Sequence, residues 1–388
     1  MYLRIYILLA FINCITSYKL ISHPLENRIA YVRGINDIKT IDDKTINKLK
    51  ADFIRHPLLI FKDIKDVAPE DFIKFTSNFD DDADVEAINQ PDKYQHQMLQ
   101  PFDQFPNCKH VAPRGYINLN DYHNIKNIQI EPYGPFKTNY IWHSDLLAHD
   151  YKLLNVVTGF YIVHQPLIGG DTDFISGETV YENLNEREKI ACKNILLEIN
   201  RRKFITDNVK QDYAGINRLE KYEEFEGNNL VPILFAPEND IEKPRILIMP
   251  SFFEKVVGWN VDDSRKWIKM FMNKHVLPYR ISVQWQKNDL AIFNNRRFIH
   301  SSTPAEQYMR NKDSENRLLL QTFIPTKRPL KAFHPSSKEV YECYNCNWIS
   351  DQEISIKSTH STINFAQKYK NNEDDETYNY QVLREDNL

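Results

Sequence analysis

The chain has 388 residues, of which 53 are acidic and 49 basic, giving a formal net charge of −4. Because 42% of the residues are hydrophobic and 12% aromatic, the chain can bury a large core, which favours a folded enzyme over an interaction tail. The chain has no excess of basic residues, so we expect no nucleic-acid partner.

The first 17 residues have the three-part layout of a secretory signal. Arg4 comes early, residues 5–12 are apolar, and the small residues Thr16 and Ser17 follow. The segment is too short for a comfortable transmembrane helix, and no later segment is apolar for long enough to span a bilayer. We therefore predict a signal peptide over residues 1–17 and a secreted or secretory-lumen location. The alternatives are a signal anchor, a buried first strand and a cytoplasmic location.

The next predicted elements alternate between helix and strand. Asp42 or Asp43 can cap a helix, residues 58–61 form an apolar strand, and Pro69 can occupy the first turn of a second helix. The apolar positions that share one face of the first helix are Ile46, Leu49 and Phe53, and those of the second are Phe72, Ile73 and Phe75.

Residues 142–145 read Trp-His-Ser-Asp. Residues two apart in a strand point to the same side, so we expect His143 and Asp145 to aim together into a barrel. A second histidine from elsewhere in the chain would complete a set of two imidazoles and one carboxylate. Such a set suits Fe(II) and leaves coordination positions open for a co-substrate and O2. This pair alone is weak evidence, because a surface or hydrogen-bonded histidine is the commoner explanation. The motifs that follow it in order strengthen the hypothesis.

The chain after this motif is again mixed. Residues 169–172 read Gly-Gly-Asp-Thr, between a strand-like segment at 155–168 and a helical segment at 185–201. Residues 206–230 form a charged insertion that resembles a mobile lid or loop. The remaining predicted elements are a helix containing Trp267, Ile268, Phe271 and Met272, and strands at 280–285, 290–293 and 317–324.

His300 is the best candidate for a third metal ligand. It follows residues 285–296, which read as a turn, an apolar strand and a polar loop. Arg317 then opens a strand that Pro325 ends, so its guanidinium projects from a rigid element. A guanidinium held in this way is a fork for a carboxylate such as that of 2-oxoglutarate. The alternative for Arg317 is a solvated charge at a strand edge.

Taken in order, these motifs resemble the taurine dioxygenase family, the Fe(II)/2-oxoglutarate-dependent oxygenases that include sulfonate and aryloxyacetate dioxygenases. The resemblance spans roughly residues 28–330, including residues 55–63, which resemble the family's early strand. It implies a double-stranded β-helix, or jelly-roll, core with flanking helices, where sequence pattern alone predicts only mixed α and β. The roles that the resemblance implies are metal ligation by His143, Asp145 and His300, and binding of 2-oxoglutarate by Thr172 and Arg317, with no catalytic residue beyond the metal ligands.

One position departs from the family's pattern. Taurine-cleaving members carry a second arginine four residues after the clamp, where this chain has Gln321. An uncharged amide cannot form the same charge-assisted pair with a sulfonate, so taurine itself becomes doubtful as the substrate. Side chains from the stretch before the His-x-Asp motif could hold an anionic substrate instead, although most such groups are solvated surface charges. They are Arg114, His110, His123 and Lys137.

We therefore predict an enzyme that hydroxylates a small anionic organic substrate with O2 and releases succinate and CO2. Two rival hypotheses remain. A zinc-dependent hydrolase also uses two histidines and a carboxylate, but it needs a general base beside the metal and has no use for the Arg317 clamp. A catalytically inactive family member, kept as a secreted binding protein, should have lost a ligand, and none of the triad is lost here.

The predicted domain organisation is a signal peptide at 1–17, a catalytic domain at 18–340 and a polar tail at 341–388. Removing Cys14 with the signal would leave four cysteines, an even set that is compatible with two disulfides. They are Cys108, Cys192, Cys343 and Cys346. The last two form a Cys-x-x-Cys motif. Besides a disulfide, this motif could be half a zinc site, a redox pair or a pair of reduced thiols.

Overall fold

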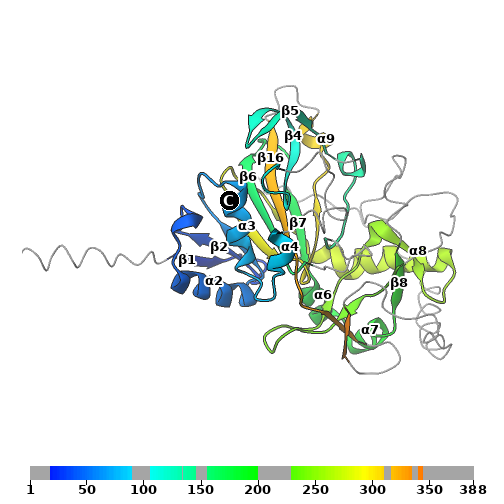
Figure 1. Ribbon diagram of the computed structural model, residues 1–388. Helices are drawn as coiled ribbons and strands as arrows, with labels where there is room; N and C mark the ends of the chain where they lie inside the picture. Colours follow the sequence, from blue (N-terminus) through cyan, green and yellow to red (C-terminus); the bar gives the residue numbers. More distant parts are fainter. Residues whose placement is uncertain are drawn as a thin grey trace, which may run out of the picture.

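The computed structural model describes residues 18–89, 105–132, 134–145, 155–199, 229–309, 316–333 and 340–343. Its largest sheet has eight strands, and all neighbours are antiparallel except one parallel pair, β2 and β3. In spatial order the strands are β1 (Lys19–Ser22), β2 (Ile29–Arg33), β3 (Leu58–Phe61), β14 (Leu290–Asn294), β6 (Val157–His164), β16 (Arg317–Ile324), β4 (Val111–Tyr122) and β5 (Ile125–Ile130) (Figure 1).

A smaller sheet packs against the inner face of this large one. Its strands are β13 (Ile281–Val283), β7 (Thr172–Ser176) and β15 (Phe298–Ser302). The two sheets enclose one apolar core, to which the large sheet contributes Phe160, Ile162, Phe293 and Leu319 and the small sheet Phe174, Val283 and Phe298. Because side chains alternate between the faces of a strand, each strand sends every second residue into this interior. The arrangement is the mixed α/β fold with a jelly-roll core that was expected.

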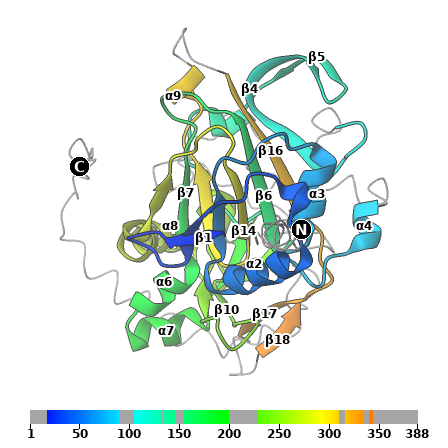
Figure 2. The ribbon, with the colours of Figure 1, turned by 90° about the vertical axis from the view of Figure 1, so that its left-hand side faces the viewer.

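Two helices cover the outer face of the large sheet, as predicted, and lie in front of it in Figure 2. Helix α2 (Asp43–Arg55) begins where the Asp42 carboxylate accepts a 2.7 Å hydrogen bond from the Thr45 amide. Helix α3 (Pro69–Ser77) begins with its proline in the first turn. The residues that pack between the helices and the sheet include Leu49, Phe53, Phe61, Phe72, Phe75, Leu318 and Leu320.

A third apolar cluster lies beyond the small sheet. Two further sheets contribute to it, one of β12 (Phe253–Val256), β8 (Leu196–Ile199) and β9 (Asn229–Pro232), the other of β11 (Arg245–Ile246), β10 (Leu234–Phe235), β17 (Leu330–Phe333) and β18 (Val340–Cys343). Helices α6 (Gly177–Asn183), α7 (Glu186–Cys192) and α8 (Val261–Phe271) pack beside them, whereas α4 (Val85–Asn89) and α9 (Glu306–Met309) lie elsewhere. The helix predicted around Trp267 is therefore confirmed as α8. No helix among the described residues is long and apolar enough to cross a membrane.

The helix predicted over residues 185–201 is wrong in its second half. Helix α7 ends at Cys192, and β8 follows with β9 on one side and β12 on the other. Three of the four residues of β8 are buried, so two strands from later in the chain bury and hydrogen-bond a segment whose own pattern also suits a helix. The predicted lid at 206–230 lies outside the described residues up to residue 228.

The two ends of the chain test the predicted domain boundaries only in part. Residues 1–17 lie outside the described residues, so the signal peptide stays a prediction. At the other end, β18 pairs with β17 along four residues, so the fold extends through Cys343, beyond the predicted boundary at residue 340. The rest of the predicted tail, including Cys346, lies outside the described residues.

The structure also bears on the two disulfides with which the four cysteines were compatible. Cys108 and Cys192 are both buried and both free, and they belong to two different apolar clusters. Burial raises the pKa of the Cys108 thiol to about 12 and raises that of Cys192 as well. Since the thiolate is the reactive form, both side chains are packing groups rather than nucleophiles.

Candidate metal centre

His143 and His300 are joined through their backbones. The His143 amide donates to the His300 carbonyl at 3.0 Å, and the His300 amide donates back at 2.8 Å. This single antiparallel bridge adds His143 to the free edge of β15, the strand that carries His300. The spacing of the two imidazoles is therefore set by a pair of peptide hydrogen bonds.

The expectation that His143 and Asp145 sit in a regular strand is wrong. Among the described residues the segment makes only the one bridge, and the single proton of the Ser144 hydroxyl is shared between the carbonyls of Asn295 and Phe298. The two side chains nevertheless point to one side. The ligand atoms offered by His143, Asp145 and His300 all lie within 4.8 Å of one another.

The three side chains form a tight triangle. Asp145 Oδ1 lies 3.4 Å from His143 Nε2, and Asp145 Oδ2 lies 3.6 Å from His300 Nε2. The ring centroids of the two histidines are 4.4 Å apart. Asp145 and His300 are buried, whereas His143 is partly exposed, so the triangle opens on one side. Three donors on one face of a site are the arrangement that leaves an ion open coordination positions.

The protonation states also suit a cation. Burial, assisted by the nearby His143, lowers the pKa of His300 to about 3, against the opposing effect of the Asp145 carboxylate. Burial raises the pKa of Asp145, but the two histidines and Thr158 outweigh it, so the net shift is downward. The Nδ1 atom of His143 lies 2.6 Å from the Ile141 carbonyl, which leaves Nε2 as the ring nitrogen that faces Asp145. Nitrogen and oxygen donors of this kind fit Fe(II), and zinc also accepts them.

Arg317 is buried rather than solvated at a strand edge. It opens β16, and its Nη2 donates to the Gly170 carbonyl at 2.9 Å. Its Nε has no hydrogen-bond partner among the described residues. Gly170 has φ +76°, and a Cβ there would lie 2.9 Å from that Nε. The Gly-Gly turn therefore lets the backbone close on the guanidinium while leaving room beside it.

Thr172 lies two residues after this turn, at the start of β7. Its hydroxyl accepts a 2.9 Å hydrogen bond from Trp285 Nε1. A hydroxyl has one proton, so that of Thr172 remains available to a second partner. Thr172 lies on the same face of β7 as Phe174. Phe174 pairs with His300 across the small sheet and packs against its ring. The structure thus places Thr172, the last residue of the Gly-Gly-Asp-Thr motif, at the barrel interior that holds the triad, and Arg317 contacts Gly170 of the same motif.

The two candidate substrate residues contact each other. Arg114 Nε donates to Gln321 Oε1 at 3.3 Å, from β4 to the neighbouring strand β16. Gln321 pairs with Phe160 of β6, and the Phe160 ring lies 6.4 Å from that of His300, so the pair faces the same interior. The other candidates have different partners: His110 contacts the Ala87 carbonyl, Lys137 pairs with Glu131, and His123 packs against Tyr122.

Sequence reasoning missed four polar residues around the triad. Trp285 holds Thr172, while Asn155, Thr158 and Asn295 surround Asp145. Asn295 belonged to the polar loop quoted before His300 and could have been singled out from it. The signal at Asn155 and Thr158 was weaker, because it consisted only of two polar residues in an otherwise apolar segment.

The comparisons with known proteins agree on one family. The model of the "Taurine catabolism dioxygenase TauD, TfdA family" matches residues 24–323. An alkylsulfatase of Acinetobacter baylyi is 26% identical over 171 residues, which cover 41% of this chain and 50% of that protein, so the match spans about half the length of this curated relative.

Solved structures show the same fold. A taurine dioxygenase from Burkholderia xenovorans superposes with a TM-score of 0.57 at 14% identity, over 89% of this chain and 99% of that one. The protein AAD-2, solved in complex with Mn(II) and N-oxalylglycine, superposes with a TM-score of 0.54 at 15% identity, over 81% of this chain and 99% of that one. Because the family model covers most of the sequence, this chain belongs to the taurine catabolism dioxygenase TauD, TfdA family.

Proposed function

We propose that this protein is an Fe(II)- and 2-oxoglutarate-dependent dioxygenase that hydroxylates a small anionic organic substrate and releases succinate and CO2. The observation that carries the proposal is the convergence, in one barrel interior, of a His-Asp-His triad within 4.8 Å and the buried Arg317 guanidinium, whose Nε has no hydrogen-bond partner in the described part of the chain. The triad alone would suit several metals. The guanidinium adds a group that recognises a carboxylate.

His143, Asp145 and His300 would hold the metal. Bound Fe(II) would supply the activation of O2 and the oxidising power, which no side chain of the protein has. His300 is neutral and Asp145 is ionised, so these two donors offer a free imidazole nitrogen and a negative charge to a divalent cation. These states need no proton to be removed before the ion binds.

The other residues would bind and orient the organic co-substrate. Arg317 can donate its free Nε–H to the far carboxylate of 2-oxoglutarate, and the Thr172 hydroxyl can donate its remaining proton to the same group. Phe160 and Phe174 pack against His300 and keep water away from that side of the centre. The chain would thus act by positioning the reactants and excluding water.

The pair of Arg114 and Gln321 supports an anionic substrate. Gln321 replaces a second strand arginine with a neutral amide, and Arg114 brings a positive charge to that amide from the adjacent strand. The relatives' names point the same way, because taurine is a sulfonate and an alkylsulfatase acts on a sulfate ester. We propose that the acidic head of the substrate lies against Arg114.

A substrate screen that follows succinate release tests this proposal. Purified protein would receive Fe(II), 2-oxoglutarate and O2 with an alkyl sulfate, an alkyl sulfonate, an aryloxyacetate and a neutral alcohol of matched length. Succinate release with an acidic member and not with the alcohol is the expected result, and Arg114→Leu should raise the KM of that substrate without changing the apparent affinity for 2-oxoglutarate. Release with the neutral alcohol alone would contradict the anionic class.

The two rival functions predict different outcomes in the same screen. A zinc hydrolase would act with Zn(II) and would not need 2-oxoglutarate or O2. An inactive binding protein would release no succinate with any substrate and would also give no slow succinate release in the absence of substrate.

A further inference from the structure

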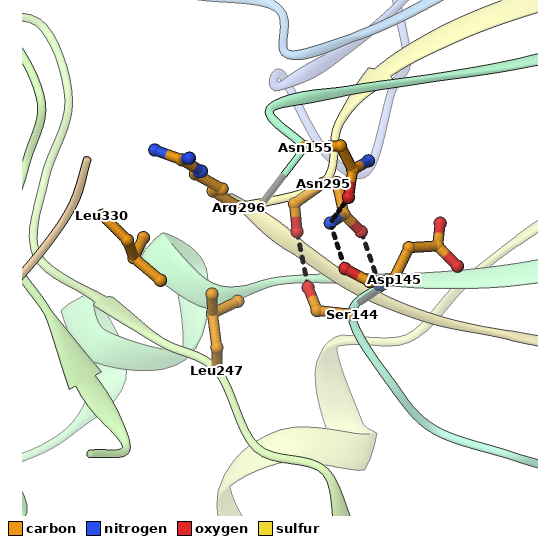
Figure 3. Close-up of a pocket in the computed structure, with 7 residues that line it drawn as sticks. All are labelled: Ser144, Asp145, Asn155, Leu247, Asn295, Arg296 and Leu330. Carbon is orange, nitrogen blue, oxygen red and sulfur yellow. Dashed lines mark hydrogen bonds between the residues drawn. The ribbon is translucent and has the colours of Figure 1, made fainter. Parts of the chain in front are cut away.

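Asn295 holds the backbone of the carboxylate ligand as a neighbouring strand would. The Asp145 amide donates to Asn295 Oδ1 at 2.7 Å, and Asn295 Nδ2 donates to the Asp145 carbonyl at 2.7 Å (Figure 3). The two residues lie 150 positions apart in the chain. The first bond fixes which end of the Asn295 amide is oxygen, because a backbone N–H can only donate.

The same side chain starts a relay of hydrogen bonds. Asn295 Nδ2 also donates to Asn155 Oδ1 at 3.1 Å, and Asn155 Nδ2 donates to the Thr158 hydroxyl at 2.8 Å. The hydroxyl then donates to Asp145 Oδ2 at 3.2 Å. Every donor in this series points towards the carboxylate, so the Thr158 proton has no other direction among these partners.

All three residues of the relay are buried, with exposed fractions of 0% for Thr158, 1% for Asn155 and 3% for Asn295. Water is therefore a poor substitute for any of them. The relay contacts only Oδ2, which also lies 3.6 Å from His300 Nε2, whereas Oδ1 faces His143 and has no contact with the relay. A carboxylate with one oxygen held by the protein presents the other to an ion.

We propose that Asn295, Asn155 and Thr158 are positioning residues that lock the carboxylate of Asp145, so that it binds the metal through Oδ1 alone. The proposal rests on the proposed function, since it assumes that the triad binds a divalent ion. Hydrogen bonds to metal ligands of this kind typically change metal affinity by about 10- to 100-fold.

The test is metal binding by the purified protein, with no turnover. Co(II) added to the metal-free protein reports both the affinity and, through its visible absorption, the ligand geometry. Thr158→Val keeps the shape of the side chain and removes the proton, so its Co(II) affinity should fall by about 10- to 100-fold. Its spectrum should also change, because a released carboxylate can bind through both oxygens. Thr158→Ser restores the hydroxyl and should restore most of the affinity and the spectrum.

Thr322→Val is the matched control. Thr322 is also fully buried, and its hydroxyl makes one donated hydrogen bond, to the His110 carbonyl at 2.9 Å. It lies in β16, paired with Gly159, the neighbour of Thr158, and it points to the opposite face of the sheet. Both valine variants should lower the melting temperature similarly, and only Thr158→Val should alter the metal affinity and spectrum.

The outcomes separate the two proposals. If the unchanged protein binds no Co(II), the metal function fails. If it binds Co(II) and Thr158→Val does so with the same affinity and spectrum, the positioning role is overturned. An equal loss of affinity in Thr322→Val would also overturn it, because the effect would then be general destabilisation. If the valine variant does not fold, Thr158→Ala, which needs less room, takes its place under the same criteria.

Discussion

Two of the regions in which this protein buries charged side chains differ in how the charges are balanced. One is the metal centre. The other is an arginine–glutamate cluster, which we define as Arg245, Arg296, Arg328, Glu238 and Glu242. In the cluster each charge has an opposite charge beside it: Glu238 lies 2.8 Å from Arg245, 3.3 Å from Arg296 and 3.6 Å from Arg328, and Glu242 lies 3.2 Å from Arg245.

The metal centre has no such balance among the described residues. Its one carboxylate, Asp145, faces two imidazoles, of which His300 is neutral. Arg317 has no carboxylate within 4 Å in the part of the chain that the structure describes, and its contacts are the Gly170 carbonyl and the Tyr308 ring. Burying a charge costs free energy unless it is paired. The difference therefore indicates that the protein itself balances the charges of the cluster, whereas a bound cation and an anionic co-substrate would balance those of the metal centre.

The largest effect should come from removing a metal ligand. We expect His143→Ala, Asp145→Ala and His300→Ala each to abolish iron binding and turnover while leaving the fold largely intact, because the described residues offer no fourth ligand at this site to replace the lost coordination bond. Iron stoichiometry and thermal unfolding of the metal-free protein measure the two halves of this prediction. Full activity in any one variant would remove that residue from the ligand set.

Glu238→Gln should destabilise the fold and leave metal binding intact. It removes the carboxylate that the buried Arg245 and Arg296 share with the half-buried Arg328, and breaking a buried ion pair in this way costs about 3–5 kcal/mol of unfolding free energy. Chemical denaturation at pH 7 measures that loss. The Co(II) affinity of the folded fraction should stay unchanged, and a large change in it would mean that the two regions are not independent.

Arg317→Leu should weaken 2-oxoglutarate binding without changing iron affinity. Losing a charge-assisted bond to a buried carboxylate costs on the order of 2–5 kcal/mol, which is at least about tenfold in the dissociation constant. Titration of 2-oxoglutarate into the iron-loaded protein measures it. Gln321→Ala, on the same strand face, should disturb substrate affinity more than 2-oxoglutarate affinity. Unchanged 2-oxoglutarate dependence in Arg317→Leu would move the clamp to another residue.

The smallest effect concerns pH. Burial raises the pKa of Glu238, but its three arginines outweigh it and hold the pKa below the ordinary 4.5. The unfolded chain therefore takes up the proton first, so the contribution of Glu238 to stability is complete above about pH 4.5 and is lost as the pH falls further. The stability gap between the wild type and Glu238→Gln should narrow below pH 4.5. A gap that is constant from pH 7 to pH 3 would argue against charge pairing as its cause.

Local signals in the sequence predicted the elements that form from their own residues. The Asp42 cap, the proline at the start of α3 and the apolar run of β3 each specify a boundary without help from distant residues. Strand β8 could not be predicted in the same way, because its two neighbours come from residues 229–232 and 253–256. Propensity is a weak guide where tertiary pairing decides the conformation.

In the candidate site, too, local motifs could be predicted from the sequence, whereas contacts between distant segments could not. The triad, Thr172 and Arg317 were found because ordered motifs of a known family carry them. The bridge between His143 and His300, the relay onto Asp145 and the contact of Arg114 with Gln321 join residues from distant parts of the chain. Nothing in a single sequence says that such residues will meet.

The link between Asp145 and Asn295, 150 residues apart, has a consequence for biosynthesis. A ribosome delivers His143 and Asp145 long before Asn295 and His300, so a growing chain holds two ligands with neither the third nor the loop that orients them. Chains grow at about 5–20 residues per second, which makes this interval on the order of ten seconds. We expect iron to bind only once β15 has emerged and paired. Metal binding would then follow the folding of the barrel and occur only in chains whose barrel is complete.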